Sequence, residues 1–384
     1  MVMVSGFYKT EMGVRCFHPS TPRSPSEKDV IDLVERAADA VRRFDQSLAT
    51  WKEPSVVGRL FARLDAVSSA GAEGSTTTFT DLLEYESSLK SAPDVADAAS
   101  VAALVEATEE AADHSLPVTC RRLHRRLFER GSPLQASDAG EWKARPNRTM
   151  DPDSPGGMFA YAAPSSVTAL LDEWQRLVMD NDGGVHEVAR QCLGHWMFEH
   201  IHPFRDGNGR VGRLLVPVVL RRKGVTRATS AFVSEGVYFD KQLYVEALKG
   251  ARISGDMLGW TRLMLGFMAQ GAEANLGRLQ RLAAIETEWR DVTGCFRSDG
   301  AIHRIVPFAL TRPAFTITDA TRVLGGTFAS VNNAVAKLVD LGLLSEATGG
   351  RRDRLFHAPA VLDVFDWFRV PRPTEDEING PGGP

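Results

Sequence analysis

The sequence has few cysteines, no long hydrophobic run and no strong excess of charge. Its four cysteines are scattered over 384 residues without a C-x-x-C pair, and the formal net charge is only −4. This pattern favours a reduced cytoplasmic protein over a disulfide-stabilised or structural-zinc protein. No apolar run approaches the roughly 20 residues that a membrane-spanning helix needs, and residues 1–10 lack the apolar core of a signal peptide. We therefore expect no membrane partner.

The chain is long enough for two or three domains. Residues 1–30 are rich in Pro and Ser, which predicts an irregular arm. Apolar residues then recur at helical spacing over residues 30–48 and again over 56–67, so two amphipathic helices are expected. Further helices are predicted over residues 91–115 and 116–130. The first third of the chain should therefore be mainly helical.

The densest chemistry lies between His202 and Arg213, where the sequence reads His-Pro-Phe-Arg-Asp-Gly-Asn-Gly-Arg-Val-Gly-Arg. Gly207, Asn208 and Gly209 disfavour a strand or a helix interior, but an apolar run follows directly. This order predicts a loop that leads into the N-terminus of a helix. The unpaired N–H groups and the positive end of the helix dipole would make that junction a site for an anion, most often a phosphate.

Five side chains complete a reaction site. Arg210 and Arg213 are three residues apart on the first helical turn, so they can converge on the same phosphates. Asp206 precedes the glycines, where a carboxylate can hold Mg2+ together with phosphate oxygens. His202 can take up a proton near neutral pH without special tuning, and Phe204 is predicted to point into the core. The stretch therefore predicts a base, a metal ligand and a phosphate cradle.

This stretch resembles the signature of the Fic family, His-Pro-Phe-x-Asp/Glu-Gly-Asn-Gly-Arg-x-x-Arg, at every fixed position. Families with this motif mostly transfer AMP from ATP to a hydroxyl side chain of a protein. The resemblance implies that His202 deprotonates a target Ser, Thr or Tyr, and that Asp206 holds Mg2+ on the α- and β-phosphates. The nucleotide-binding residues that it implies are Phe204, Gly207, Asn208, Gly209, Arg210 and Arg213.

A second match to the family lies upstream. Ser69 and Glu73 are four residues apart, so on a helix they share one face, and Gly74 can end that helix. In isolation this is an ordinary helix end. The inhibitory helix of the family carries Ser/Thr-x-x-x-Glu-Gly/Asn, and the resemblance implies that Glu73 pairs with Arg213 where the γ-phosphate would bind. Ala72 replaces the bulky apolar residue usual in the family, so we expect an inhibitory helix that is easily displaced.

Residues 140–161 are punctuated by Gly, Pro and Asn and end in Met158, Phe159 and Tyr161, which favours loops and short strands. In the family this region is a β-hairpin flap over the active site, to which the target segment adds as a strand. The chain departs from the usual flap sequence by a Pro- and Gly-rich insert after Met150. That departure concerns target docking rather than nucleotide binding.

The C-terminal third predicts three helices followed by two short strands, at residues 302–310, 318–324, 327–341, 343–346 and 354–357. This order is similar to the winged helix-turn-helix that often follows Fic domains in bacteria. Polar side chains that could contact DNA are Thr327, Ser330, Asn332, Asn333, Lys337, Arg351, Arg352 and Arg354. Because the chain is acidic overall, a protein-interaction or dimerisation role is as strongly expected as DNA binding.

Together these patterns predict a mainly α protein, with a Fic-type helical core and β-hairpin flap between an N-terminal helical region and a C-terminal winged helix. The predicted parts are an N-terminal region at 1–114, with the inhibitory helix near 65–74, a Fic catalytic domain at 115–280, a winged helix domain at 295–370 and a disordered tail at 371–384.

Three functions stay open at this point. The first is a protein adenylyltransferase held in check by Glu73, which uses ATP and Mg2+ and modifies a protein that can be the chain itself. The second keeps the site but removes AMP or transfers another phosphate-containing group, and Glu73 would then align a water molecule. The third is a DNA-binding regulator whose Fic core senses nucleotide. A homodimer is compatible with each of them.

Overall fold

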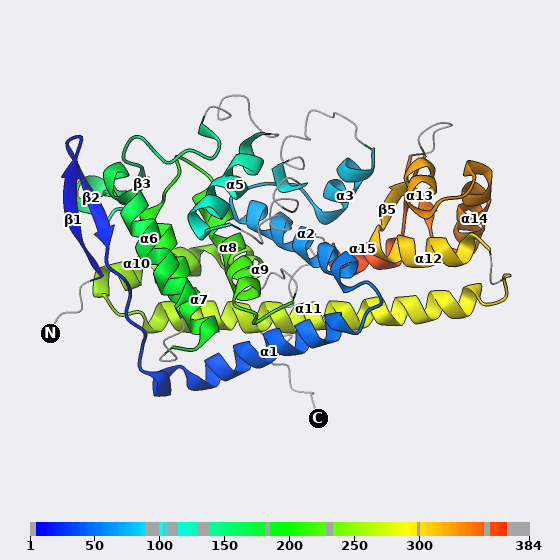
Figure 1. The fold of residues 1–384 in the computed structure, drawn as a ribbon, viewed down its shortest axis with the longest axis horizontal. Helices are drawn as coiled ribbons and strands as arrows, with labels where there is room; N and C mark the ends of the chain where they lie inside the picture. The colour runs from blue at the N-terminus through cyan, green and yellow to red at the C-terminus, as the bar shows by residue number, and fades with distance from the viewer. Residues whose placement is uncertain are drawn as a thin grey trace. The chain divides into compact units, whose positions relative to one another are not determined.

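The computed structural model describes residues 5–88, 100–102, 105, 114–129, 138–180, 185–227, 233–297, 300–348 and 354–366. The chain divides into two compact units, the first made of Met1–Thr77 and Ser91–Leu279 and the second of Thr78–Lys90 and Gln280–Pro384. Helices make up most of both units, which confirms the prediction of a mainly helical protein (Figure 1). The four-part division expected from the sequence stays a prediction.

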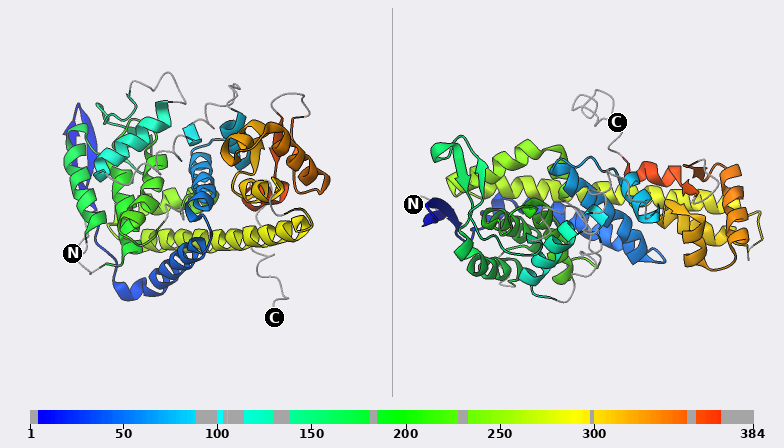
Figure 2. Two further views of the ribbon diagram at one scale, coloured as in Figure 1. Left: turned by 45° about the vertical axis from the view of Figure 1, so that its right-hand side comes forward. Right: turned by 90° about the horizontal axis from the view of Figure 1, so that it is seen from above.

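The described helices of the first unit are α1 (Ile31–Ala49), α2 (Pro54–Ala72), α5 (Leu116–Glu129), α6 (Val167–Met179), α7 (Glu187–Ile201), α8 (Asn208–Arg222), α9 (Ser234–Phe239), α10 (Lys241–Ser254) and the first part of α11 (Leu258–Thr293). Helix α7 packs against α6 and α8, while α2 packs against α8 and α9 (Figures 1 and 2). From Val188 to Ile201 every residue of α7 is buried. The α7–α8 pair is therefore central to this unit, and the loop between the two helices carries the motif.

The N-terminal segment differs from its prediction. Instead of an irregular arm, strands β1 (Gly6–Glu11) and β2 (Val14–Pro19) form an antiparallel hairpin. Met12 and Gly13 both have positive φ, 50° and 73°, which suits a two-residue hairpin turn. Strand β2 buries side chains against α7 and the flap, so tertiary contacts stabilise a hairpin that would be marginal alone. The Pro- and Ser-rich composition that suggested the arm is concentrated after the hairpin.

A second hairpin occupies the predicted flap region. Strands β3 (Arg148–Met150) and β4 (Met158–Ala160) pair antiparallel, with Arg148 opposite Ala160. Two ion pairs hold the insert after β3 at Asp151, whose carboxylate lies 2.7 Å from Arg252 Nη2 and 2.7 Å from Lys249 Nζ. These two ion pairs attach the flap to α10.

The described part of the second unit contains α3 (Phe79–Ser88), the end of α11, α12 (Ile302–Thr311), β5 (Ala314–Thr316), α13 (Ile317–Leu324), α14 (Phe328–Asp340), β6 (Ser345–Glu346), β7 (Leu355–His357) and α15 (Pro359–Phe365). The three strands form one sheet in the order β5-β7-β6. Thr316 and Thr327 cap α13 and α14 by accepting hydrogen bonds from backbone N–H groups of the first turn. The sequence predicted α12, α13, α14 and the last two strands, but not β5 or α15.

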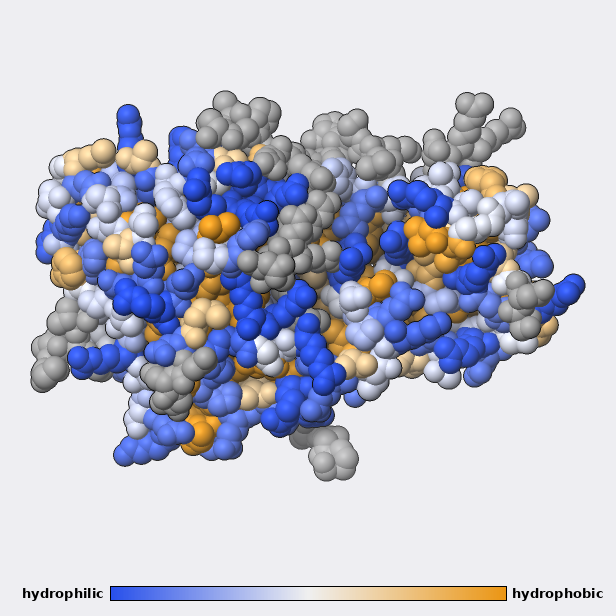
Figure 3. Space-filling view, viewed as in Figure 1, coloured by the Kyte–Doolittle hydropathy of each residue, from blue (hydrophilic) through white to orange (hydrophobic). Residues whose placement is uncertain are grey.

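Three further features concern other parts of the chain. Residues 234–254 form two helices, α9 and α10, that meet at Asp240. Some predictions fall outside the described residues. These are most of the helix predicted over 91–115, the wing residues Arg351 and Arg352, and the tail at 371–384. None of the described helices combines the length and apolar character that crossing a membrane requires. On the face shown in Figure 3, hydrophobic residues lie in small separate groups between hydrophilic ones.

Candidate active site

One pocket of the first unit, about 700 Å³ in volume, gathers most of the residues singled out in the sequence. Residues of the motif, the flap and α10 line this pocket, and one carboxylate comes from the end of α2. Among the motif and upstream residues, those that line the pocket are His202, Arg205, Asp206, Gly207, Asn208, Gly209, Arg210, Arg213 and Glu73. The chain thus brings two sequence matches that are more than a hundred residues apart into one site.

The loop between α7 and α8 (residues 202–207, the motif loop) is closed by Asn208. The Asn208 Oδ1 accepts a hydrogen bond from Phe204 N at 2.8 Å, and its Nδ2 donates to Phe204 O at 2.9 Å. Gly207 precedes α8 with φ of 75°, and a Cβ there would lie 2.8 Å from the side chain of Leu127. Glycine is therefore required at this turn. Asn208 holds the loop in shape, and a direct contact between its amide and nucleotide stays a prediction.

His202 is the C-cap of α7 and adopts a left-handed backbone conformation, with φ of 48°. Its Nδ1 lies 3.2 Å from the backbone oxygen of Glu199. A carbonyl oxygen only accepts, so Nδ1 carries the proton and Nε2 keeps its lone pair. Burial, reinforced by the nearby Lys143 ammonium, lowers the pKa of His202 to about 3. The imidazole is consequently neutral at pH 7, which is the form that a general base requires.

Asp206 lies on the exposed side of the motif loop. Its Oδ1 accepts a hydrogen bond from Gly207 N at 2.7 Å, its Oδ2 lies 3.8 Å from Arg210, and its side chain is 55% exposed. Arg210 also places its guanidinium 5.5 Å from the ring centre of Phe128. The carboxylate and guanidinium therefore lie together at the mouth of the pocket.

Arg213 is held by the end of α2, as the upstream match suggested. The guanidinium is 2% exposed, and it donates from Nε to Ser69 Oγ at 3.0 Å and from Nη2 to Ser69 O at 2.9 Å and Glu73 Oε1 at 2.8 Å. Gly74, with φ of 95°, and Ser75 donate backbone hydrogen bonds to Gly71 O and Ala70 O, respectively. This is a Schellman end, and it fixes where the Glu73 side chain leaves the helix.

The Glu73 carboxylate lies over the first turn of α8. A Cβ at Gly209 would be 2.4 Å from Glu73 Oε1, so this close approach needs a glycine at 209. Partial burial opposes the charge of Glu73, but Arg213 and then Lys241, whose Nζ is 3.6 Å from Oε2, hold the pKa of the carboxyl below its ordinary value. Burial likewise opposes the charge of Arg213, but the Glu73 carboxylate holds the pKa of Arg213 above its ordinary value. The pair is therefore ionised at pH 7.

Sequence reasoning missed the aromatic and polar residues that hold the motif from outside. His124 of α5 stacks on Phe204 at a ring distance of 3.8 Å and donates from Nε2 to Asp206 O at 3.0 Å. Burial lowers the pKa of His124 to about 4, so it is neutral in this role. Tyr161 stacks on His202, also at 3.8 Å. No spacing rule within the sequence pairs these residues.

A buried carboxyl lies beneath the pocket. Glu199 is 6% exposed, and burial raises the pKa of its carboxyl to about 7 despite the opposing effect of Arg213. A Cβ at Gly212 would lie 2.5 Å from Glu199 Oε1, so the side chain packs against the backbone of α8. The sequence offers no signal for this residue because a glutamate near a helix end is usually solvated.

The described residues contain no group of three His, Cys, Asp or Glu side chains that could hold a metal ion by themselves. His195 and His200 are buried, and a ring nitrogen of each lies 2.9 Å from Tyr244 Oη and Trp196 O, respectively. The single exposed carboxylate of Asp206 fits Mg2+ of the kind that takes one or two protein oxygens and completes its shell with phosphate oxygens and water. Such an ion would need a nucleotide in the pocket.

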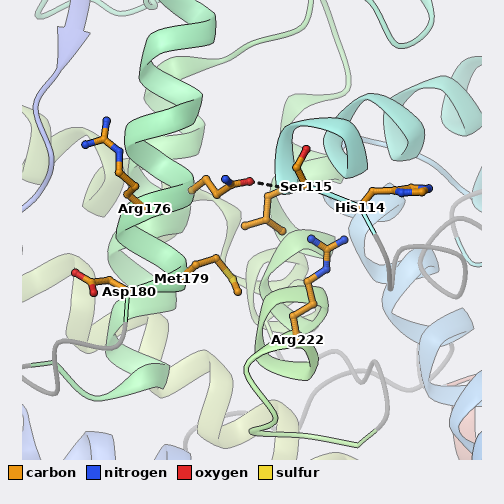
Figure 4. A pocket seen from close by; sticks show the side chains of 8 residues that line it. His114, Ser115, Arg176, Met179, Asp180 and Arg222 are labelled. Carbon is orange, nitrogen blue, oxygen red and sulfur yellow. Dashed lines mark hydrogen bonds between the residues drawn. The ribbon is translucent and has the colours of Figure 1, made fainter.

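A second pocket of the first unit, about 600 Å³, lies where α5 begins and α6 ends (Figure 4). Figure 4 shows Met179 directed towards Arg222, whereas the side chains of Arg176 and Asp180 point away from it. The backbone N–H of Leu116 donates to Gln175 Oε1 at 2.9 Å. This pocket holds none of the motif residues, so the chemistry is assigned to the larger one.

Comparisons with known proteins cover the part of the chain that carries the motif. Residues 117–220 match the profile of the Fic/DOC family, and residues 31–113 match that of the Fic/DOC family N-terminal region. The chain is 32% identical over 103 residues to "Protein adenylyltransferase Fic" of Drosophila ananassae, a match that covers 27% of this chain and 19% of the relative. It is 31% identical over 91 residues to a probable protein adenylyltransferase of Aquifex aeolicus, covering 24% of each chain. The matches thus span a quarter or less of these curated relatives.

The fold agrees with the sequence matches. A crystal structure of a Fic family protein from Desulfovibrio desulfuricans superposes with a TM-score of 0.54 at 17% identity, over 88% of this chain and 98% of that one. At this identity the likeness concerns the fold alone. The two family profiles and the shared helical fold lead to one conclusion: this chain belongs to the Fic/DOC family.

Proposed function

We propose that this protein is a protein adenylyltransferase, which transfers AMP from ATP to a hydroxyl side chain of a protein, and that Glu73 keeps its activity low. The observation that supports this most is the pocket in which a neutral histidine and a phosphate-binding helix N-terminus meet Arg213, whose guanidinium is bonded to Glu73. The names of the curated relatives point to the same reaction.

In the proposed reaction the target hydroxyl oxygen attacks the α-phosphorus of ATP. Nε2 of His202 takes the hydroxyl proton, the new oxygen–phosphorus bond forms, and the bond from the α-phosphorus to the bridging oxygen breaks. The leaving group is pyrophosphate, which carries the negative charge of the broken bond. The hydrogen bond from Nδ1 to Glu199 O supports this role, because it leaves Nε2 as the basic nitrogen.

The rest of the pocket would bind the triphosphate. Backbone N–H groups at the start of α8 are expected to contact the phosphates, and Arg210 and Arg213 to neutralise the β- and γ-phosphates. Asp206 would hold Mg2+, which supplies positive charge to the phosphate oxygens when it is bound. Phe204 supports the site from the core, since its ring is fully buried between His124 and Trp142 rather than in the pocket.

Inhibition follows from competition for Arg213. The Glu73 carboxylate accepts a hydrogen bond from the guanidinium that would bind the γ-phosphate. The negative charge of Glu73 also lies over the N-terminus of α8, which would attract phosphate. ATP would then bind in a pose that keeps its α-phosphorus from the incoming hydroxyl. Displacing the end of α2 would restore the site.

The test is transfer of label from ATP to protein in Mg2+, with α-labelled and γ-labelled ATP side by side, for the wild type, Glu73→Gly and His202→Ala. We expect label from the α-position only, more of it in Glu73→Gly, and a loss of at least about a hundredfold in His202→Ala. Equal transfer by His202→Ala and the wild type would reject the proposal. Removal of AMP from a modified protein by the wild type, with no removal by Glu73→Gly, would show that this site catalyses removal of AMP instead.

We infer further that the second unit contains a winged helix-turn-helix. Helices α12, α13 and α14 and the β5-β7-β6 sheet have the order that this module requires, and the capped helix α14 exposes Ser330, Asn333 and Lys337. Phe328 is also 57% exposed at the start of α14, which suits a protein partner or a second copy of the chain better than a phosphate backbone. Sequence-specific, salt-dependent DNA binding that is lost in Lys337→Ala would instead favour a DNA-binding regulator.

A further inference from the structure

Tyr161 connects the flap to the histidine of the motif. Its ring lies face to face on the imidazole of His202, with ring centres 3.8 Å apart and planes within 10° of parallel. Its backbone N–H donates to Asn147 O at 3.2 Å, directly before strand β3. Asn147 in turn donates from Nδ2 to Phe204 O at 2.7 Å. Tyr161 is thus fixed between the flap and the motif loop.

The imidazole needs such a partner. The hydrogen bond from His202 Nδ1 to Glu199 O is 3.2 Å long, at the weak end of the range. Rotation of the ring about its bond to the backbone would break that bond and move Nε2 away from the attacking hydroxyl. A flat ring stacked over the whole imidazole face opposes this rotation, because a turned imidazole would collide with it.

We propose that Tyr161 is a positioning residue, whose ring keeps Nε2 of His202 directed at the target hydroxyl and whose backbone hydrogen bond to Asn147 couples that orientation to the flap. The proposal rests on the proposed function. If a target segment adds to the flap along β3, docking there would tighten the contacts from Asn147 through Tyr161 to His202. Orientation of this kind contributes to the rate of the chemical step rather than to nucleotide affinity.

A purely structural role for Tyr161 fits the geometry less well. The residue is only partly buried and lines the pocket. Phe159 also lines the pocket but is 4% exposed and packs with Phe17 of the first hairpin at 5.7 Å. Phe159 also lies 4.1 Å from the guanidinium of Arg252, which is paired with Asp151. The flap is therefore also attached by Asp151 and by Phe159, whose ring contacts Tyr161 edge-on at 5.1 Å.

The experiment compares Tyr161→Phe, which keeps the stacked ring, with Tyr161→Leu, which removes it, both in the full chain carrying Glu73→Gly. Tyr8→Leu is the matched control, because it removes a tyrosine ring from the exposed hairpin β1–β2. We expect kcat to fall about tenfold or more in Tyr161→Leu with KM for ATP within about twofold, and Tyr161→Phe to stay within about threefold of the parent. An unchanged kcat in Tyr161→Leu, or a raised KM at constant kcat, would overturn the proposal.

A second readout does not depend on AMP transfer. In NMR spectra of the chain labelled at histidine, the ring current of Tyr161 should displace the Cε1–H signal of His202, and Tyr161→Leu should abolish that displacement while Tyr161→Phe keeps it. The nitrogen shifts should report a single tautomer with an unprotonated Nε2 in the parent and a mixture in Tyr161→Leu. If Tyr161→Leu does not fold, Tyr161→Met, which also removes the ring, is measured instead and should give the same mixture of tautomers and the same fall in kcat.

The two readouts separate the possible failures. If no variant transfers AMP but the His202 tautomer depends on the ring at 161, the proposed function is wrong and the positioning of the imidazole stands as a structural fact. If AMP is transferred and neither kcat nor the tautomer responds to Tyr161→Leu, the positioning role alone is wrong.

Discussion

Replacing Glu73 with glycine should raise the rate of AMP transfer by about tenfold to a hundredfold, because it removes the carboxylate that occupies Arg213. The magnitude follows from the two contacts of that carboxylate. The hydrogen bond from Arg213 at 2.8 Å joins two charged groups, and such a bond typically contributes about 1.5–3 kcal/mol. Since the Glu73 side chain is 36% exposed, solvent screening places it in the lower half of that range.

Lys241 adds little to this sum. Its Nζ is 3.6 Å from Glu73 Oε2 and its side chain is 52% exposed, so this pair contributes about 0–1 kcal/mol. The two contacts together give about 1.5–3 kcal/mol, and each 1.4 kcal/mol corresponds to a tenfold change in the population of the displaced state. The active pose of ATP should become available in the same proportion.

The assay is the initial rate of α-label transfer at saturating ATP, with Glu73→Gln beside Glu73→Gly. The glutamine keeps a hydrogen bond to Arg213 but not the charge, so its rate should lie between those of the wild type and the glycine variant. Glu53→Gln removes an exposed glutamate from the other end of α2 and should leave the rate unchanged. A rate of Glu73→Gly equal to that of the wild type would refute the inhibitory role of this residue.

Three further outcomes are expected. Ser69→Ala removes the hydrogen bond to Arg213 Nε, so the AMP transfer rate should rise by less than about tenfold, and a greater rise than in Glu73→Gly would contradict the reasoning. Because burial lowers the pKa of His202 to about 3, the base stays unprotonated as pH falls from 7.5 to 5.5, and the rate of Glu73→Gly should change less than about twofold, against about tenfold for a base at its ordinary pKa of about 6.5. Glu199, whose pKa burial raises to about 7, holds a proton in the folded state that it loses on unfolding, so its contribution to stability falls as pH rises towards 7. Glu199→Gln should therefore raise Tm more at pH 8 than at pH 5, and its effect on the free energy of unfolding should differ by up to about 3 kcal/mol between the two pH values. An equal change in Tm at both pH values would show that the carboxyl titrates normally.

The local part of the site could be predicted from the sequence because its residues are neighbours in the chain. Glycines before an apolar run fix a loop and a helix N-terminus through backbone sterics alone, and α8 begins at Asn208 as that order predicts. The same holds for the end of α2, where Gly74 terminates the helix and the i, i+4 spacing puts Ser69 and Glu73 on one face. Period and capping residues carry this information within a few turns.

The contacts across the fold were decided only by the tertiary structure. Neither periodicity nor composition places Tyr161 on His202 or His124 on Phe204, since each stack joins residues that are about 40 to 80 positions apart. The first hairpin was missed for the same reason: strand β2 is stabilised by burial against α7 and the flap, which a local pattern does not report. The depressed pKa of His202 likewise comes from burial by distant segments. The sequence by itself determined the chemical groups and their local backbone, and tertiary packing determined their protonation, their orientation and the pairing of Glu73 with Arg213.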